Sequence, residues 1–356
     1  MVSTYIDLEV FRQNYSQALL SKEVTLRPNG VLPHMDLIYR SDAMSAVMDA
    51  ALAVADADSA ILLTGESGTG KEVVASFIHE QSKRGGHGMV AINCASLPES
   101  LLEAELFGYE KGAFTGASTA GKPGLIESAE GSTLFLDEIN SMPMALQGKL
   151  LRVLETKQVK RIGSIKERTI DFRVIAATNA DLASCVAKGT FRMDLYYRLN
   201  VIPLLIPPLR QRRDDIMPLC KFFLKKYFEQ YGKLKILSNQ AFETLKAYDW
   251  PGNVRELKNF IERLVVTGIF PDPYINNISP ELFGQPYALT NQSGAAQTPG
   301  TQELRRIVNE LKENQGNRAK TAEFLGISRR TLQYKLKKYK IETRLEPKVY
   351  VNSNLY

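Results

Sequence analysis

The sequence has little of what a disulfide-bonded or metal-binding protein needs. Its 356 residues include three cysteines and three histidines. Cys94, Cys185 and Cys220 are odd in number and far apart, which favours reduced cytosolic thiols over a disulfide framework. The histidines are scattered along the chain, so we expect no metal site built from histidine and cysteine.

Long hydrophobic runs are missing as well. The longest are of the kind "VIPLLIPPL" at 201–209, which is broken by proline and falls well short of the ~20 residues of a membrane-spanning helix. The first residues, "MVSTYIDLEVFRQNY", carry acidic side chains early and contain no apolar core segment, so no signal peptide is predicted. We therefore expect a cytoplasmic protein with no membrane partner.

An excess of charge of one sign is found in a single C-terminal segment. The net charge is +6, and residues 301–341 contain eleven Lys or Arg against four Asp or Glu, a local excess of +7. The rest of the chain therefore sums to −1. This distribution is typical of a protein in which one small segment meets nucleic acid.

Alternation of strand-like and helical patterns dominates the first half of the chain. Between Asp36 and about Pro208 it predicts an α/β fold with a parallel sheet flanked by helices. Buried strands are expected at 60–64, 89–93, 133–137 and 173–179, and an amphipathic helix at 144–155. The expected segments are a leader (1–35), the α/β subdomain (36–208), an α-helical subdomain (209–278), a Pro- and Gly-rich linker (279–300), a small basic domain (301–341) and a C-terminal tail (342–356).

The stretch "LLTGESGTGKE" at 62–72 predicts a strand, a glycine loop and a helix. Gly65 to Lys71 matches the G-x-x-x-x-G-K pattern, in which backbone N–H groups and a helix N-terminus cradle phosphates. Lys71 would reach the β- and γ-phosphates of ATP. The strict pattern continues with Ser or Thr, where this chain has Glu72. The candidate ATP-binding residues are Gly65, Glu66, Ser67, Gly68, Thr69, Gly70, Lys71 and Glu72.

Two further strand ends carry candidate catalytic side chains. "STLFLDE" at 132–138 ends in Asp137, expected to bind Mg²⁺, and Glu138, expected to polarise the attacking water. A buried strand capped by solvated acids is the alternative, but the glycine loop lies roughly 70 residues upstream, in the right order for a nucleotide site. In "AATNADL" at 176–182, Thr178 and Asn179 are candidate sensors of the γ-phosphate or, alternatively, a polar turn.

The stretch "GAFTGA" at 112–117 neither alternates like a strand nor repeats like a helix. Taken alone, it favours a buried turn around a core phenylalanine. With its neighbours it forms part of a longer series of motifs. These are "GESGTGKE" (65–72), "NCASLPESLLEAELFGYEKGAFTGA" (93–117), "GSTLFLDEI" (131–139), "FRMDLYYRLNVIPLLIPPLRQRRDDI" (191–216) and "WPGNVRELKN" (250–259).

In this order the motifs resemble those of bacterial enhancer-binding proteins, which are sigma-54-dependent transcription activators with an AAA+ ATPase core. The resemblance covers about residues 36–341, and the family itself has Glu after the loop lysine, as here. It implies that GAFTGA lies on a loop that contacts sigma-54 and moves with the ATP state. The implied contact residues are Gly112, Ala113, Phe114, Thr115, Gly116 and Ala117, and a second insertion near 161–169 would support that loop.

The resemblance also implies roles for four polar residues of the ATPase core and lid. Asn93 resembles the switch asparagine that holds the catalytic glutamate, here Glu138, away from water. Arg192 and Arg198 resemble arginines that reach the ATP of a neighbouring subunit, which implies a closed ring, usually a hexamer. A surface ion pair, for instance with Asp194, is the alternative for either arginine. Arg255 resembles the lid arginine that contacts nucleotide, whereas Trp250 and Pro251 are expected to be packing and turn residues.

The segment at 317–339, "NRAKTAEFLGISRRTLQYKLKKY", has the form of a helix-turn-helix. Asn317 and Ser328 can cap its two helices, and Ala322, Leu325, Leu332, Leu336 and Tyr339 would face inward. The segment resembles the Fis-type DNA-binding domain usual in this family. Its second helix would present Arg329, Arg330, Gln333, Tyr334 and Lys337 to DNA. A solvated basic helix is the alternative.

We therefore expect an ATPase that uses ATP and Mg²⁺, binds enhancer double-stranded DNA, assembles with itself and remodels the sigma-54 RNA polymerase closed complex into an open complex. One alternative is a repressor that has lost contact with sigma-54, but GAFTGA is intact. Another is an AAA+ motor that acts on nucleic acid or on a different protein. The short leader predicts no receiver domain, constitutive ATPase activity and control by expression level or by a trans-acting regulatory protein.

Overall fold

A computed structural model of the chain describes residues 37–113, 121–279, 282–283, 307, 310, 317–325, 327, 329–338, 341–343 and 349–351. The chain divides into two compact units, Met1–Ile278 and Ser279–Tyr356, and each is described by itself. None of the helices in the described ranges is long and apolar enough to cross a membrane. The predicted leader, most of the predicted linker and Phe114 to Ala117 lie outside the described residues.

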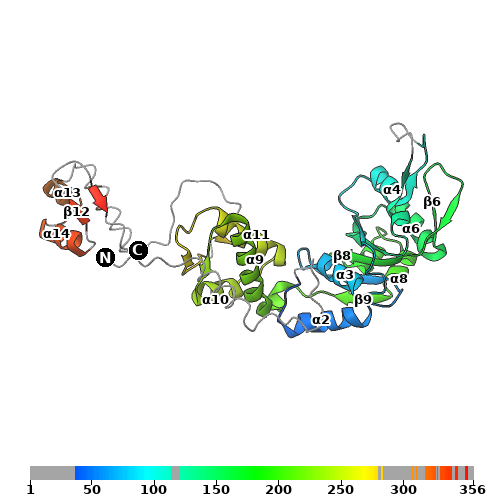
Figure 1. Cartoon of the computed structure of the whole chain (residues 1–356), viewed down its shortest axis with the longest axis horizontal. Helices are drawn as coiled ribbons and strands as arrows, with labels where there is room; N and C mark the ends of the chain where they lie inside the picture. Colours follow the sequence, from blue (N-terminus) through cyan, green and yellow to red (C-terminus); the bar gives the residue numbers. More distant parts are fainter. Residues whose placement is uncertain are drawn as a thin grey trace. The chain divides into compact units, whose positions relative to one another are not determined.

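The first unit is built on a five-stranded parallel sheet (Figure 1). Across the sheet the strands are β2 (Val90–Asn93), β5 (Thr133–Asp137), β8 (Arg173–Thr178), β1 (Ile61–Thr64) and β9 (Ile202–Leu205). The four predicted strands are confirmed. The fifth, β9, lies at the sheet edge, where Pro203 is tolerated because an edge strand leaves one row of backbone groups unpaired.

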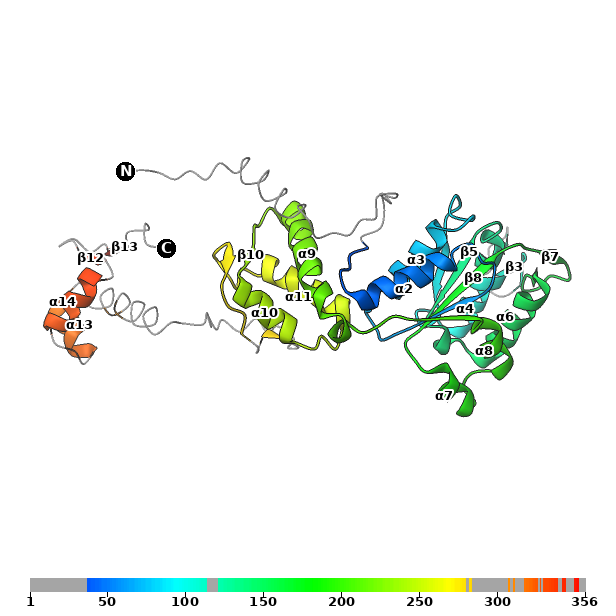
Figure 2. The same ribbon diagram turned by 90° about the horizontal axis from the view of Figure 1, so that it is seen from below.

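Each face of the sheet is covered by helices, so successive strand residues are buried on opposite sides. Ile61, Leu63 and Phe135 pack against α2 (Asp42–Ala53) and α3 (Lys71–Glu80). Leu62 and Leu134 face the other cluster, formed with α4 (Glu99–Phe107), α5 (Leu125–Ser128), α6 (Met144–Thr156), α7 (Leu182–Ala187) and α8 (Met193–Leu199). Figure 2 shows α2 and α3 on one side of the strands and α6 and α8 on the other. The predicted helix at 144–155 is confirmed as α6.

Two short insertions extend from this α/β layer. The first runs from β3 (Gly108–Tyr109) to β4 (Lys122–Pro123), which pair antiparallel. The second is the hairpin of β6 (Gln158–Lys160) and β7 (Glu167–Thr169), also antiparallel. A short 3-10 turn, η1 (Ile139–Ser141), follows β5.

The rest of the first unit is mainly helical, as predicted. It contains the 3-10 turns η2 (Leu209–Gln211) and η3 (Arg213–Asp215), followed by α9 (Ile216–Tyr231), α10 (Asn239–Ala247) and α11 (Asn253–Val266). A short parallel pair, β10 (Ile236–Leu237) and β11 (Tyr274–Ile275), was not anticipated. Trp250 is fully buried against Phe260 and Tyr248, which confirms its packing role.

In the second unit, α13 (Arg318–Phe324) and α14 (Arg329–Lys338) form the predicted helix pair. Ala322, Leu332 and Leu336 are buried together with Ile307, which confirms the expected inward face for these three positions. An antiparallel pair, β12 (Ile341–Thr343) and β13 (Val349–Val351), begins at the last residue of the expected basic domain and continues into the segment expected to be a tail. Ser328 and Tyr339 lie outside the described residues.

Candidate nucleotide site and DNA-binding helix

The glycine loop joins the carboxyl end of β1 to the amino end of α3, as its sequence predicts. Gly68 and Gly70 have φ values of 77° and 102°, which glycine adopts without the steric cost that a side chain would bring. A Cβ at Gly68 would lie 2.4 Å from the carbonyl oxygen of Gly252, so the site also requires glycine for close approach. Ser67 is exposed and Glu72 lies exposed in the first turn of α3.

Lys71 is folded back onto this loop. Its Nζ donates hydrogen bonds to the carbonyl oxygens of Gly65 at 2.7 Å and Glu66 at 3.0 Å. Burial lowers the pKa of Lys71, while the nearby carboxylates of Asp137 and Glu138 act in the opposite direction. The ammonium group thus lies between the loop and the two acids, where a polyphosphate and its counter-ion would have complementary charge.

The loop also offers backbone donors. Within the described part of the chain, the amides of Gly68, Gly70 and Lys71 donate to no protein acceptor. The loop's amides stand at the N-terminus of α3, where the helix dipole adds partial positive charge. These groups fit the phosphates of a nucleotide.

The candidate catalytic carboxylates lie at the carboxyl end of β5. Glu138 has a left-handed backbone, with φ of 50°, and its amide donates to Asp137 Oδ1 at 3.0 Å. The Asn93 carboxamide donates to Asp137 Oδ2 at 3.1 Å and not to Glu138. The parallel register places Asn93 opposite Asp137, which explains this choice of partner.

The expected sensors occupy different environments. Thr178, the last residue of β8, is fully buried, and its hydroxyl donates to Asn140 Oδ1 at 2.8 Å and accepts from the amide of Ala180. Asn179 is exposed at the wall of a cavity of about 460 Å³, together with Gly65 and Glu66. Only Asn179 therefore has a side chain turned to open space beside the loop.

The helical subdomain contacts the glycine loop directly. An Arg255 guanidinium nitrogen donates to Ser67 Oγ at 2.9 Å, so this arginine does lie at the loop. The guanidinium of Arg210 binds both carboxylate oxygens of Glu66, at 2.5 and 2.8 Å. These bonds and one from Asn253 lower the pKa of Glu66 to about 2. The contacts of Arg210 and Asn253 with the loop were not predicted, because only the fold brings these residues to it.

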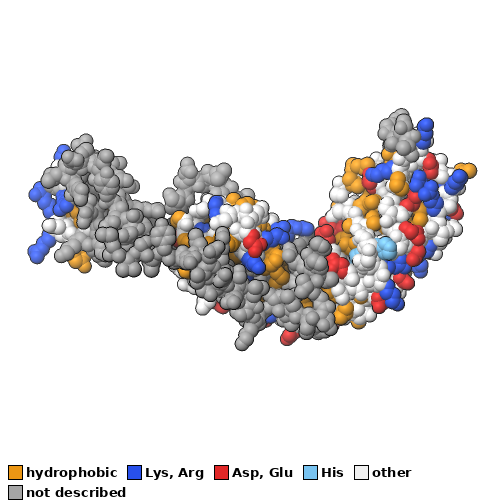
Figure 3. Space-filling view, in the orientation of Figure 1, with side chains coloured by type: hydrophobic (Ala, Val, Ile, Leu, Met, Phe, Trp, Pro, Cys, Tyr) orange, Lys and Arg blue, Asp and Glu red, His pale blue; other side chains and the backbone are white. Residues whose placement is uncertain are grey.

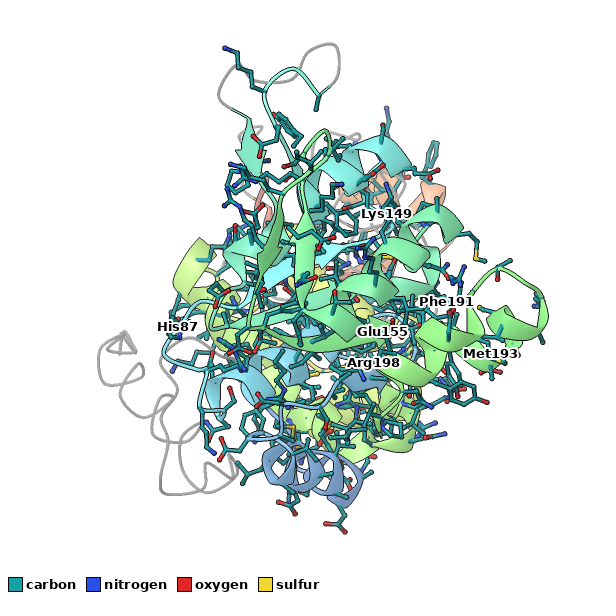
Figure 4. All side chains as sticks on the ribbon, turned by 90° about the vertical axis from the view of Figure 1, so that its right-hand side faces the viewer. His87, Lys149, Glu155, Phe191, Met193 and Arg198 are labelled. Carbon is teal, nitrogen blue, oxygen red and sulfur yellow. The ribbon has the colours of Figure 1, made fainter. Side chains whose placement is uncertain are left out.

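Arg192 and Arg198 bond to groups other than the glycine loop. Arg192 pairs with Asp194 through two hydrogen bonds, at 3.0 and 2.7 Å, which is the alternative considered from the sequence. Arg198 is exposed and donates to the Leu154 carbonyl at 2.9 Å. It lines a cavity of about 380 Å³ that includes Asp58, Ala60 and Val174, at the amino ends of β1 and β8. Figure 4 looks onto this side, where Arg198 lies near Glu155 of α6.

The base of the GAFTGA segment is bonded to the β6–β7 hairpin. The amide of Ile162 donates to the carbonyl of Gly108, and the amide of Glu110 donates back to the carbonyl of Ile162. Arg161 binds the Glu127 carboxylate at 2.6 and 2.8 Å and lies 3.6 Å from Glu110. Gly112 and Ala113 are described and lie at this base. In Figure 3, acidic and basic side chains are interspersed over this end of the unit.

Comparisons with known proteins bear on all three parts of the chain. Residues 37–205 match the family described as "Sigma-54 interaction domain", and residues 210–289 match "AAA+ ATPase lid domain". Residues 299–339 match "Bacterial regulatory protein, Fis family". The regulatory protein AtoC of Escherichia coli K12 is 46% identical over 316 residues, which cover 86% of this chain and 68% of AtoC. This chain belongs to the sigma-54-dependent transcriptional regulators.

Other relatives of this regulator agree with that assignment. The transcriptional regulatory protein ZraR of Klebsiella oxytoca is 41% identical over 337 residues, covering 93% of this chain and 75% of ZraR. The crystal structure of NtrX from Brucella abortus in complex with ATP is 35% identical, with a TM-score of 0.63, and the match covers 93% of this chain and 73% of NtrX. The AAA+ core, lid and helix-turn-helix expected from the sequence are thus confirmed.

The helix-turn-helix of this sigma-54-dependent regulator presents polar side chains on α14. Arg329, Arg330, Gln333 and Tyr334 are exposed, whereas Leu332 is buried beneath them. Lys337 belongs to the same helix, but its side chain lies outside the described residues. Asn317 Oδ1 accepts from the amide of Lys320 at 3.2 Å, which confirms the predicted cap of α13.

Proposed function

We propose that this regulator hydrolyses ATP and uses the hydrolysis cycle to convert the sigma-54 RNA polymerase closed complex into an open complex. It would act in the cytoplasm as a closed ring, usually a hexamer in its family, bound to enhancer DNA through α14. The observation that carries the proposal is the convergence of Lys71, which follows β1 and the glycine loop, with Asp137 and Glu138 at the carboxyl end of β5. The GAFTGA base is attached to the same α/β layer through Glu127 and the β6–β7 hairpin.

The loop would bind the triphosphate through the free amides of Gly68, Gly70 and Lys71 and through the Lys71 ammonium. Asp137 is the carboxylate suited to hold Mg²⁺, which would supply charge neutralisation at the phosphates. Glu138 would orient and polarise the attacking water. Asn179 would report on the γ-phosphate, whereas Thr178 would hold the strand end through Asn140.

Asn93 would act on this chemistry through Asp137. In the present conformation its carboxamide is bound to that carboxylate, and the switch would move this bond to Glu138, the residue that follows Asp137 at the end of β5. Arg255 would bring the lid to the nucleotide, since it already bonds to Ser67. Arg198 would act on the nucleotide of a neighbouring copy, and Arg192 would do so only after release from Asp194.

The sigma-54 contact would be made by the GAFTGA residues, with Phe114 as an apolar anchor and Thr115 as a polar contact. The test is co-elution of the purified protein with sigma-54, with and without ADP and aluminium fluoride as a transition-state analogue. We expect complex formation that requires the analogue and is lost in Thr115→Ala. Thr119→Ala, two residues after the motif in the sequence, is the matched control and should behave as the unchanged protein.

A protein that hydrolyses ATP and binds DNA but never captures sigma-54 would instead support the alternative that this regulator is a repressor without a sigma-54 contact. Capture that persists equally in Thr115→Ala would remove the proposed role of GAFTGA.

A further inference from the structure

Three consecutive carbonyl groups of the glycine loop accept hydrogen bonds from the lid side of the first unit. The carbonyl of Ser67 accepts from the Asn253 carboxamide at 3.0 Å. That of Gly68 accepts from the amides of Val254 at 3.0 Å and Arg255 at 3.4 Å. That of Thr69 accepts from the buried guanidinium of Arg212 at 2.5 Å. The lid therefore holds the outer, carbonyl side of the loop.

These bonds matter for phosphate binding because a peptide unit is planar. The carbonyl of one residue and the amide of the next belong to the same rigid plane and point in opposite directions. A carbonyl of Ser67 fixed toward the lid therefore turns the amide of Gly68 away from the lid. By the same argument, fixing the carbonyl of Thr69 sets the direction of the Gly70 amide. Both amides are free of protein acceptors in the described part of the chain.

Asn253 is the residue best placed to control this geometry. It is fully buried, and its Nδ2 also donates to Glu66 Oε2 at 3.2 Å, while its Oδ1 accepts from the amide of Leu209 at 2.7 Å. One carboxamide thus connects the loop, the first segment after β9, and the first turn of α11. Its φ of 54° is a left-handed value, which asparagine tolerates better than most residues.

We propose that Asn253 is a positioning residue that aims the amides of the phosphate loop and couples nucleotide binding to the lid. It touches the loop backbone and not the reacting atoms. Because coupling between two sites is reciprocal, a nucleotide that draws the loop amides inward favours one arrangement of Asn253, Val254 and Arg212 over others. The lid would then respond to occupancy of the loop through its hydrogen bonds to the loop carbonyls.

Two substitutions distinguish the role of the Asn253 side chain from that of its left-handed backbone. Asn253→Gly removes the carboxamide but accepts the left-handed backbone, so a fold defect caused by strain is avoided. Asn253→Asp keeps the shape and the acceptor for Leu209, but removes the donor to Ser67 and brings a second negative charge to Glu66. Asn259→Ala is the matched control, because Asn259 is an exposed asparagine of the same helix.

The first readout is the division between KM and kcat for ATP. We expect KM to rise about tenfold in Asn253→Gly, equivalent to ~1.4 kcal/mol, and further in Asn253→Asp, with kcat within roughly threefold. A merely destabilised lid would lower the folded fraction, and therefore kcat, without raising KM. Dissociation constants for ADP, measured with a fluorescent analogue, should follow KM. Wild-type KM and ADP affinity in both folded variants would overturn the proposal.

The second readout uses Trp250, the single tryptophan of the chain, which is buried three positions before Asn253. Its fluorescence should change when ADP binds to the unchanged protein and to Asn259→Ala, and the change at saturation should be lost in Asn253→Asp. ADP binding without any response of Trp250 in the unchanged protein would overturn the coupling to the lid. The inference rests on the proposed function for the identity of the nucleotide. Failure to bind ATP or ADP at all would defeat both, whereas failure to capture sigma-54 would leave this inference standing.

Discussion

At the scale of single residues, unusual backbone geometry coincides with the candidate site. Four described residues other than glycine have positive φ, and three of them are Glu138, Trp250 and Asn253. Such conformations cost of order 1–3 kcal/mol and persist only where the surroundings enforce them. The left-handed backbone of Glu138 is held by the hydrogen bond from its amide to Asp137. That of Asn253 is held by the hydrogen bonds of its side chain to the loop and to Leu209. Three of the four positions therefore lie at the candidate catalytic strand end and at the lid contact, and the fourth, Lys157, ends α6.

Glu138→Gln tests the assignment of the water-polarising carboxylate. The amide keeps the shape but lacks the basicity, so kcat for ATP hydrolysis should fall by roughly 10²- to 10⁴-fold, while the dissociation constant for ATP stays within about threefold. Steady-state phosphate release and equilibrium nucleotide binding measure the two quantities. Glu155→Gln, an exposed glutamate on α6, is the control and should leave both unchanged. If Glu138→Gln retains its turnover, a group other than Glu138 polarises the attacking water.

The pair of Glu66 and Arg210 makes a prediction about pH. Arg210→Ala should raise the pKa of Glu66 from about 2 toward 4.5, because the first cause of the lowering is the hydrogen bond from Arg210. A carboxyl whose folded pKa is depressed contributes stability above its unfolded pKa and loses it as the pH falls through the folded value. The stabilising effect of Arg210 should thus be complete above about pH 4.5 and disappear toward pH 2. Carboxyl NMR titration of Glu66 measures the shift, and an unchanged midpoint would contradict it.

At the scale of secondary-structure elements, hydrophobic patterning predicted the strands whose positions depend on burial in the core. Strands β1, β5 and β8 are buried almost throughout, because helices cover both faces of the sheet. These three strands and the edge strand β2 were each predicted within a residue. Strand β9 was missed, because Pro203 interrupts the run and its tolerance depends on an edge position that only the assembled sheet defines. The β12–β13 pair was missed in a polar segment without strong periodicity.

The candidate site was predictable where a motif is contiguous and not where it is assembled from distant parts. The glycine loop, Asp137 and Glu138 follow from local sequence. The contacts of Asn253, Arg210 and Arg212 with the loop join positions more than 140 residues apart, and no periodicity or short pattern reports them. The partner of Asn93 likewise depends on the register of β2 against β5, which brings Asp137 opposite it.

Glu127 attaches α5 to the β6–β7 hairpin, and we expect sigma-54 capture to depend on this attachment. This carboxylate is 7% exposed and binds Arg161 and Arg168, both from the hairpin. Glu127→Gln should loosen the hairpin from the GAFTGA base and lower sigma-54 capture by roughly tenfold or more, because hydrogen bonds to charged groups are worth ~1.5–3 kcal/mol. ATP binding should remain, since Glu127 does not touch the glycine loop. Co-elution with sigma-54 in the presence of the transition-state analogue measures the loss.

Glu167→Gln is the matched control for that variant. Glu167 lies in the same hairpin and pairs with Arg152 at 2.7 Å, but both side chains are exposed, and such surface pairs contribute ~0–1 kcal/mol. It should capture sigma-54 as the unchanged protein does. Equal loss of sigma-54 capture in the two variants would mean that capture depends on the charge of the hairpin and not on the buried ion pairs of Glu127.

At the scale of the whole molecule, the position of Arg198 is the feature to explain. Lys71 and Glu138 lie at the carboxyl ends of the parallel strands, whereas Arg198 lines a cavity at their amino ends. An arginine on that side of the sheet cannot serve the nucleotide of its own subunit without leaving its place. It can serve that of a neighbour if copies associate head to tail, the heterologous contact that closes into rings. Complete sites would then exist only between subunits.

Mixing two inactive variants tests this arrangement. Lys71→Ala removes the nucleotide loop's lysine but keeps Arg198, and Arg198→Ala does the reverse. In an equal mixture that assembles at random, about a quarter of the subunit contacts pair an intact loop with an intact arginine, whatever the ring size. The ATPase rate should therefore recover to about a quarter of the unchanged protein's rate. A mixture of Lys71→Ala with Glu138→Gln carries both defects in the same half of the site and should stay inactive. If the first mixture also stays inactive although the variants co-assemble, Arg198 does not act across the subunit contact. Arg192, once released from Asp194, would then be the arginine that reaches the nucleotide of the neighbouring subunit.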